Sequence, residues 1–88
     1  MAARKQYKLL IARRFAKDLR HISADTQPRV LAALERLAQD PFSGERVVAA
    51  QTGNYRYRVG DYRIRYDIVG DEVHVLRVRH RREVYRQN

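Results

Sequence analysis

Residues 55–66, YRYRVGDYRIRY, constrain the fold of this chain more than any other stretch. Arginine alternates with tyrosine, valine or isoleucine on both sides of a central Gly60-Asp61. A period of two places successive side chains on opposite faces of a β-strand, and a glycine-containing pair between two such runs is typical of a two-residue hairpin turn. The stretch therefore predicts an antiparallel hairpin with one arginine face and one apolar face.

A two-residue turn also fixes which hairpin residues lie opposite each other. The expected pairs are Val59 with Tyr62, Arg58 with Arg63, Tyr57 with Ile64, and Arg56 with Arg65. Like charges in opposed positions repel each other, at about 5 Å by roughly 1–3 kcal/mol per pair. A bound nucleic-acid backbone would turn that repulsion into attraction. The alternative is that the arginine stems only cover apolar surface while their charged heads point into solvent.

The rest of the chain predicts two helices and two further strands. Residues 6–12 are a short apolar run typical of a strand, and residues 13–22 place apolar side chains at helical spacing. A second helix is expected to run to about Gln39, with Ser23 or Asp25 as its N-cap and Pro28 in or just past its first turn. Residues 43–54 are loop-like.

A second turn at residues 70–72 leads to a last strand, VHVLRVRH. An odd-length loop or a bulge would set Ile64 near Leu76, and the odd-length loop is favoured because it keeps charge out of the core. It also brings Arg63, Arg77 and Arg79 to a common face. The predicted fold is β-α-α-β-β-β, an α+β domain spanning residues 1–88, with both helices on one face of a twisted, mainly antiparallel four-stranded sheet.

The composition indicates which classes of binding partner to expect. The 88 residues carry 19 lysines and arginines against 10 acidic residues, a formal charge of +9, and 16 of the cations are arginine. The guanidinium fork grips phosphate or carboxylate at two points, so a polyanion or an acidic protein is the expected partner. No stretch is apolar enough to span a membrane, which predicts a cytoplasmic protein without a membrane partner. The sequence has no cysteine, and its histidines and carboxylates lack metal-ligand spacing, so neither metal nor cofactor is expected.

The ending VRHRREVYR, residues 78–86, together with the hairpin and the element order, resembles the RelE/ParE superfamily of bacterial toxin–antitoxin toxins, and within it the RelE-like messenger-RNA endoribonucleases. The resemblance covers nearly the whole chain. It implies metal-independent cleavage of messenger RNA in the ribosomal A site, by attack of a ribose 2′-OH on the adjacent phosphate. It also implies inhibition by a cognate acidic antitoxin, with contact to operator DNA only through that antitoxin.

The resemblance implies site residues by position. The catalytic set is Arg56, Arg58, Arg63, Arg79, Arg81 and Tyr85, and the RNA-binding set is Arg65, Arg77, His80 and Arg82. Arginine stays protonated, so the arginines before and after the turn are expected to stabilise the charged phosphorane and not to act as bases. Tyr85 is the candidate base, because nearby arginines favour its phenolate. The donor to the leaving oxygen stays open among Arg79, Arg81 and His80.

Two alternatives come from other classes. One is a ParE-like inhibitor of DNA gyrase without nuclease activity, against which the HRREVY ending and the density of arginine argue. The other is a non-catalytic nucleic-acid-binding module, in which Tyr85→Phe would leave function intact.

Overall fold

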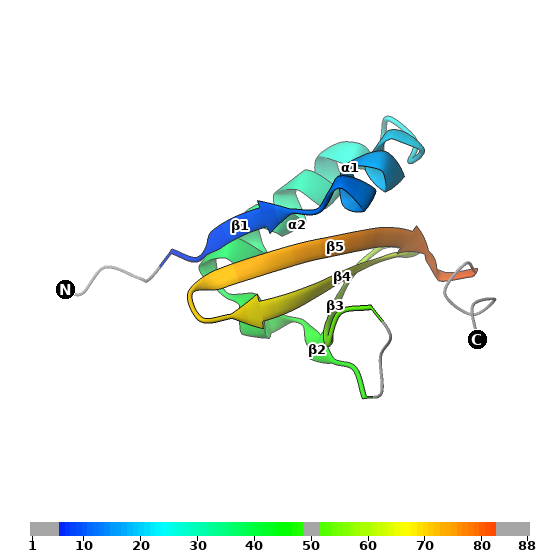
Figure 1. The fold of residues 1–88 in the computed structure, drawn as a ribbon. Coiled ribbons are helices and arrows are strands. Elements are labelled where there is room, and N and C mark those ends of the chain that lie inside the picture. Colours follow the sequence, from blue (N-terminus) through cyan, green and yellow to red (C-terminus); the bar gives the residue numbers. More distant parts are fainter. Residues whose placement is uncertain (1–5, 49–51, 83–88) are drawn as a thin grey trace.

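Two helices and five strands follow one another in the computed structural model, which describes residues 6–48 and 52–82 (Figure 1). The elements are β1 (Lys8–Ile11), α1 (Arg13–Arg20), α2 (Gln27–Gln39), the 3₁₀-helix η1 (Pro41–Ser43), β2 (Glu45–Arg46), β3 (Tyr55–Val59), β4 (Tyr62–Val69) and β5 (Glu72–His80). The predicted α+β class and element order are confirmed. The two-residue β2 is an addition, because it lies in a segment predicted to be a loop and raises the strand number from four to five.

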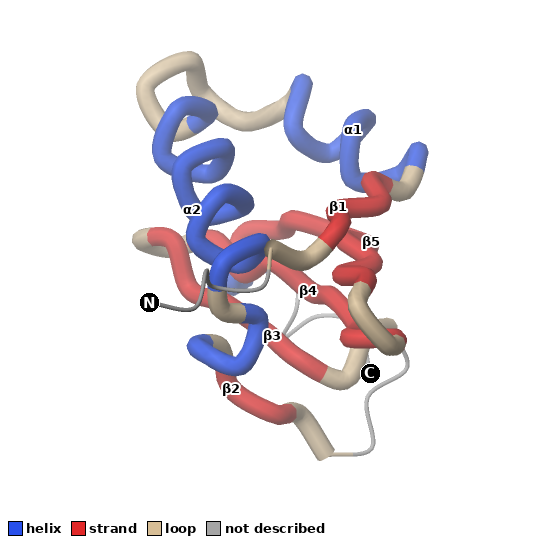
Figure 2. Tube along the Cα trace, turned by 90° about the vertical axis from the view of Figure 1, so that its left-hand side faces the viewer, coloured by secondary structure: helices blue, strands red, loops and turns tan. Residues whose placement is uncertain are grey.

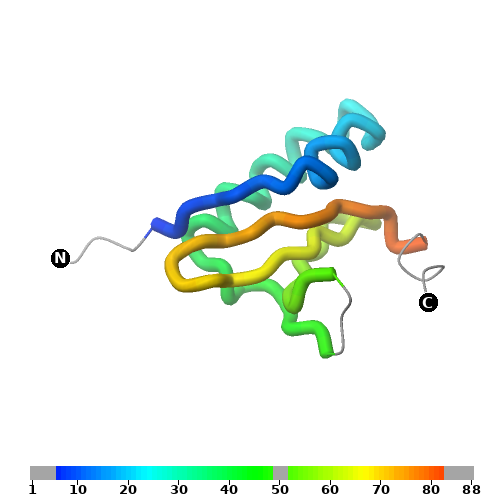
Figure 3. The backbone as a smooth tube through the Cα atoms, viewed as in Figure 1, coloured from blue at the N-terminus to red at the C-terminus, as the bar shows by residue number. Residues whose placement is uncertain are grey.

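All five strands form one sheet in the order β1-β5-β4-β3-β2. β1 is the parallel edge strand, and β5 lies between it and β4 (Figure 3). The remaining neighbours are antiparallel. Both α-helices cover the same face of this sheet, and neither covers the other face (Figures 1 and 2). Within the described residues, one face of the sheet is therefore not covered by a helix.

The core lies between the helices and the apolar face of the strands. Its largest fully buried side chains include Phe15 and Leu37 from the helices and Ile64 and Tyr66 from β4. Tyr57 also packs against this core, so the predicted apolar face of the hairpin is the face that meets the helices. The Tyr66 hydroxyl donates a hydrogen bond of 2.6 Å to the carbonyl of Pro41. Burial raises the pKa of Tyr66 to about 12, because the charged phenolate would lose its hydration.

The start of α2 differs from the prediction. The helix begins at Gln27 with Thr26 in the N-cap position, so neither Ser23 nor Asp25 caps it. Ser23 instead donates its hydroxyl to the Thr26 hydroxyl at 3.1 Å. Pro28 lies in the first helical turn, as predicted. Several polar residues in a row can each cap a helix, so the local sequence did not select one.

The hairpin pairing predicted from residues 55–66 is confirmed in full. The connection between β4 and β5 is different, because Val69 pairs with Glu72 across the two-residue turn Gly70-Asp71. The predicted odd-length connection is therefore wrong. Gly70 adopts a positive φ of 60°, a conformation that glycine takes without steric cost.

A β-bulge corrects the register that an even turn would give. The partner on β5 changes from Val75 to Arg77 between consecutive β4 residues, which leaves Leu76 as the extra residue. Ile64 consequently pairs with Val78 and not with Leu76. The bulge keeps apolar side chains in the core and places the β5 arginines on the uncovered face.

Candidate functional site

Six arginines form two rows across β3, β4 and β5. Residues paired across antiparallel strands point to the same side of a sheet, with strands about 4.8 Å apart. The register aligns Arg58, Arg63 and Arg79 in one row and Arg56, Arg65 and Arg77 in the other. These residues alternate with the buried core residues, so they occupy the face that the helices leave uncovered. We call this surface the arginine face.

Glu45 of β2 partly neutralises one side of the arginine face. Its register partner is Arg56, and its Oε1 lies 3.2 Å from Nε of Arg56 and 3.3 Å from Nε of Arg58. The side chains of Glu45 and Arg58 are 56% and 57% exposed. Exposed ion pairs stabilise a fold by about 1 kcal/mol at most, so Glu45 orients the two arginines and leaves them accessible.

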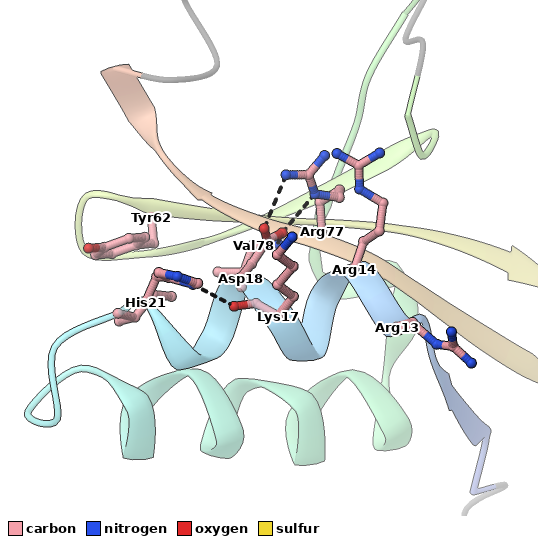
Figure 4. A pocket seen from close by; sticks show the side chains of 9 residues that line it. Arg13, Arg14, Lys17, Asp18, His21, Tyr62, Arg77 and Val78 are labelled. Atoms are coloured by element: carbon pink, nitrogen blue, oxygen red, sulfur yellow. Dashed lines mark hydrogen bonds and ion pairs between the residues drawn. The ribbon is translucent and has the colours of Figure 1, made fainter.

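Asp18 of α1 binds the opposite end of the second row (Figure 4). Its carboxylate accepts from Nε of Arg77 at 2.7 Å and from Nη2 at 3.1 Å, and it also accepts from the backbone N–H of Val78 at 3.2 Å. Both side chains are less than a fifth exposed, at 16% and 17%. This two-point contact fixes α1 to the edge of β5 beyond the end of β1.

Arg65 is the centre of the second row, between Arg56 and Arg77, and the charge of Asp67 compensates it in part. One Nη2–H donates to the carbonyl of Gly53 at 2.9 Å. Its Nε is buried and has no hydrogen-bond partner within residues 6–48 and 52–82. Burial is the first cause that lowers the pKa of Arg65, and the charges of Arg56 and Arg79 lower that pKa further. A charge held at such a cost favours a bound anion.

The remaining predicted residues lie near the turn between β3 and β4. Arg63 donates to the carbonyls of Gly60 and Tyr62, each at 3.3 Å. Arg81 follows β5, and its backbone N–H donates to the carbonyl of Asp61 at 2.7 Å. This bond places Arg81 beside the turn, next to the first arginine row.

His80 lies on the other side of the sheet from the arginine rows. It pairs with Tyr62, whose neighbours on the same face are core residues, and the two rings contact edge-on at 5.3 Å. His80 Nδ1 accepts from the backbone N–H of Arg82 at 3.2 Å, and the Arg82 side chain is exposed. The arginine face therefore gathers six of the predicted residues without His80. Tyr85 lies outside the described residues.

Sequence reasoning did not identify Glu45 and Asp18 as parts of this site. Glu45 lies in a segment that the local pattern predicted to be a loop. Asp18 is the only carboxylate within α1, and this was the one available signal for a specific contact. Among the described residues no three histidine, aspartate or glutamate side chains are grouped so as to hold a metal ion, and no helix is long and apolar enough to cross a membrane.

The fold and the arginine face define a small basic α+β protein with six arginines in two rows on the sheet face that the helices leave uncovered. Residues 9–85 match the family described as ParE toxin of the type II toxin–antitoxin system parDE. The toxin RelE3 of Methanocaldococcus jannaschii is 30% identical over 83 residues, which cover 89% of this chain and 94% of that protein. The chain therefore belongs to the ParE toxin family of type II toxin–antitoxin systems, and the predicted RelE/ParE resemblance is confirmed.

Solved structures support the same assignment. The RelBE2 toxin–antitoxin complex of Mycobacterium tuberculosis contains a chain with a TM-score of 0.76 and 25% identity, covering 85% of this chain and 98% of that one. The RelB–RelE antitoxin–toxin complex of Methanococcus jannaschii gives a TM-score of 0.73 and 27% identity, covering 90% and 98%. The protein is thus a type II toxin with the RelE fold.

Proposed function

We propose that this toxin is a ribosome-dependent endoribonuclease that cleaves messenger RNA in the A site. The observation that carries the proposal is the arginine face, where two aligned rows of guanidinium groups include the half-buried Arg65. An RNA backbone compensates such a surface through phosphate contacts. The relative RelE3 is similar in sequence over nearly its whole length, and the toxin chains of the solved complexes carry the same fold.

The reaction needs no group that the chain lacks. The ribose 2′-oxygen forms a bond to the adjacent phosphorus, the bond from phosphorus to the 5′-oxygen breaks, and a 2′,3′-cyclic phosphate results. Arg56, Arg58 and Arg63 stabilise the negative charge of the pentavalent intermediate. Tyr85 accepts the 2′-OH proton, and Arg79 or Arg81 stabilises or protonates the departing 5′-oxygen. His80 is the weaker candidate for this last role, because it lies on the opposite side of the sheet from the arginine rows.

The proposed partner is an acidic antitoxin that covers the arginine face. Both compared structures are complexes of a RelE toxin with a RelB antitoxin. Carboxylates of such a partner would replace the RNA phosphates on the same arginines. Contact with operator DNA would run only through the antitoxin, and the site of action would be the cytoplasm, where the ribosomes are.

Mapping the ends of cellular messages after a brief induction of the toxin tests this function. We expect cuts within codons for the wild type, fewer cuts for Arg63→Ala and Tyr85→Phe, and unchanged cutting for Arg46→Ala. Arg46 is the matched control because it is exposed and pairs with Tyr55, on the side of the sheet away from the arginine rows.

The family description also names ParE, so inhibition of DNA gyrase is the second candidate. The same induced cells distinguish the two functions. Chromosomal breaks with intact messages would replace the ribonuclease proposal by the gyrase one.

A further inference from the structure

A pocket of about 710 Å³ opens between α1 and the adjoining part of β4 and β5 (Figure 4). Its apolar surface comes from Ile22 and Val78, and its rim carries Arg14 and Lys17 of α1. None of the residues assigned above to the catalytic step lines it. The volume lies within the range of small-molecule and cofactor sites, which is about 300–1,000 Å³.

Two ring-bearing side chains stand on opposite walls of this pocket. Tyr62 comes from the first position of β4 and His21 from the residue that ends α1 (Figure 4). The edge-on contact with His80 holds the Tyr62 ring, and the His21 Nδ1 is hydrogen-bonded to the carbonyl of Lys17 at 2.9 Å. Both rings are thus positioned by the fold before any ligand binds.

The rim of the pocket supplies cations for an anion. The side chains of Arg14 and Lys17 are exposed, and neither makes an ion pair or side-chain hydrogen bond within the part of the chain that the structure describes. The single carboxylate of the lining, Asp18, is already engaged by Arg77 and by the Val78 N–H. The pocket therefore presents an excess of positive charge beside two rings.

Arg77 joins this pocket to the arginine face. It ends the second arginine row and also lines the pocket, and in Figure 4 the guanidinium groups of Arg14 and Arg77 point to the same side of β5. Tyr62 lies on the helix-covered face, so a strand of RNA that follows the row from Arg56 to Arg77 reaches the pocket by passing over the edge of β5 beyond the end of β1.

We propose that this pocket is a nucleotide-binding subsite, in which one unpaired base of the substrate stacks on Tyr62 beside His21 while Arg14 and Lys17 bind its phosphate. The inference rests on the proposed ribonuclease function, since it extends the path of the same RNA. Stacking on an aromatic ring suits any base, because every base has a π-face. An acidic peptide would use the cations but would leave the two rings without a matching group, and for this reason RNA is the favoured occupant.

Binding of a fluorescent single-stranded RNA octamer with 2′-O-methyl riboses tests the subsite, because the blocked 2′-oxygen prevents cleavage. We expect Arg14→Gln with Lys17→Gln to weaken binding about 10-fold and to reduce the slope of log affinity against log salt by about 0.7 for the lost phosphate contact. Tyr62→Leu should weaken binding by about 5- to 150-fold with an unchanged salt slope, as expected for loss of base stacking.

Matched controls separate these effects from general loss of charge or packing. Arg20→Gln removes a cation of α1 that does not line the pocket, and Tyr57→Leu removes a half-buried ring of β3 that lies on the same sheet face but does not line the pocket. If the pocket variants bind the octamer no more weakly than their controls, or if the wild type does not bind it, the subsite is wrong. Unchanged RNA affinity combined with lost neutralisation by the antitoxin would assign the pocket to an acidic protein instead.

The outcome is separable from that of the proposed function. Wild-type cleavage of ribosome-bound message with pocket variants that behave as controls would overturn the subsite alone. Pocket-dependent binding without any cleavage by the wild type would keep the subsite and overturn the ribonuclease.

Discussion

At the scale of single residues, ion pairs stabilise the two ends of the arginine face, whereas its centre has an unsatisfied hydrogen-bond donor. Asp18 and Glu45 neutralise the flanks, while Arg65 keeps a buried Nε without a hydrogen-bond partner in the described part of the chain. The two carboxylates differ in burial, since Asp18 is mostly buried in its ion pair with Arg77 whereas Glu45 is exposed. Buried and exposed ion pairs should therefore respond very differently to mutation.

Asp18→Asn should destabilise the protein by about 3 kcal/mol, because Arg77 would keep a mostly buried charge without its carboxylate. Urea unfolding followed by circular dichroism measures the change. Glu45→Gln is the matched control and should cost no more than about 1 kcal/mol. Equal effects of the two substitutions would contradict the structural role given to Asp18, and a double-mutant cycle with Arg77→Gln isolates the pair.

The buried hydroxyl of Tyr66 gives a second prediction at this scale. Its folded-state pKa of about 12 lies above the ordinary value of 10.0, so the fold favours the neutral ring. The neutral Tyr66 hydroxyl therefore contributes fully to the free energy of unfolding below pH 10. This contribution is lost as the pH rises from 10 through about 12, because the hydroxyl releases its proton at a lower pH in the unfolded chain than in the fold. A shift of two units corresponds to roughly 2–3 kcal/mol.

Tyr66→Phe should remove this loss of stability at alkaline pH. The fall in unfolding free energy between about pH 9 and about pH 12 should be smaller in the variant than in the wild type. Some fall should remain in both proteins, because the other tyrosines titrate in both. An identical fall in both would show that Tyr66 is not held neutral by burial.

At the scale of elements, the hairpin was predictable and its surroundings were not. The period of two and the Gly60-Asp61 turn determine the pairing of β3 with β4, because both signals are local. The two-residue β2 and the position of the bulge at Leu76 depend on neighbouring strands, so no short window of sequence determines them. The same reason explains why the arginines were found and their carboxylate partners were missed, since Asp18 is 59 residues from Arg77 along the chain.

The link between η1 and β2 depends on a glycine. A Cβ at Gly44 would overlap the Tyr66 hydroxyl and would lie 2.6 Å from the carbonyl oxygen of Arg56. Gly44→Ala should therefore cost about 1–3 kcal/mol, as overpacking of a tight site does. Thermal unfolding measures this cost.

Combining Gly44→Ala with Tyr66→Phe gives the internal control for that prediction. The double variant removes the clash with the hydroxyl but keeps the clash with the backbone, so the two costs should be less than additive. Full additivity would mean that the alanine does not meet the tyrosine.

At the scale of the whole molecule, charge and fold point to the same partner. The formal charge of +9 destabilises any compact chain of 88 residues through self-repulsion, and the fold concentrates much of it on the uncovered sheet face instead of dispersing it. The helices cover the opposite face and carry the core. The arginine face is therefore one surface whose charges a polyanion or an acidic partner would compensate.

Cleavage of messenger RNA on purified, programmed ribosomes tests this account most directly. The wild type should cut within the A-site codon, Arg56→Gln and Arg63→Gln should each reduce the rate at least about 10²-fold through lost charge stabilisation, and Arg46→Gln should cut like the wild type. Absence of cleavage by the wild type, or equal cleavage by the arginine-face variants and the Arg46 control, would contradict it.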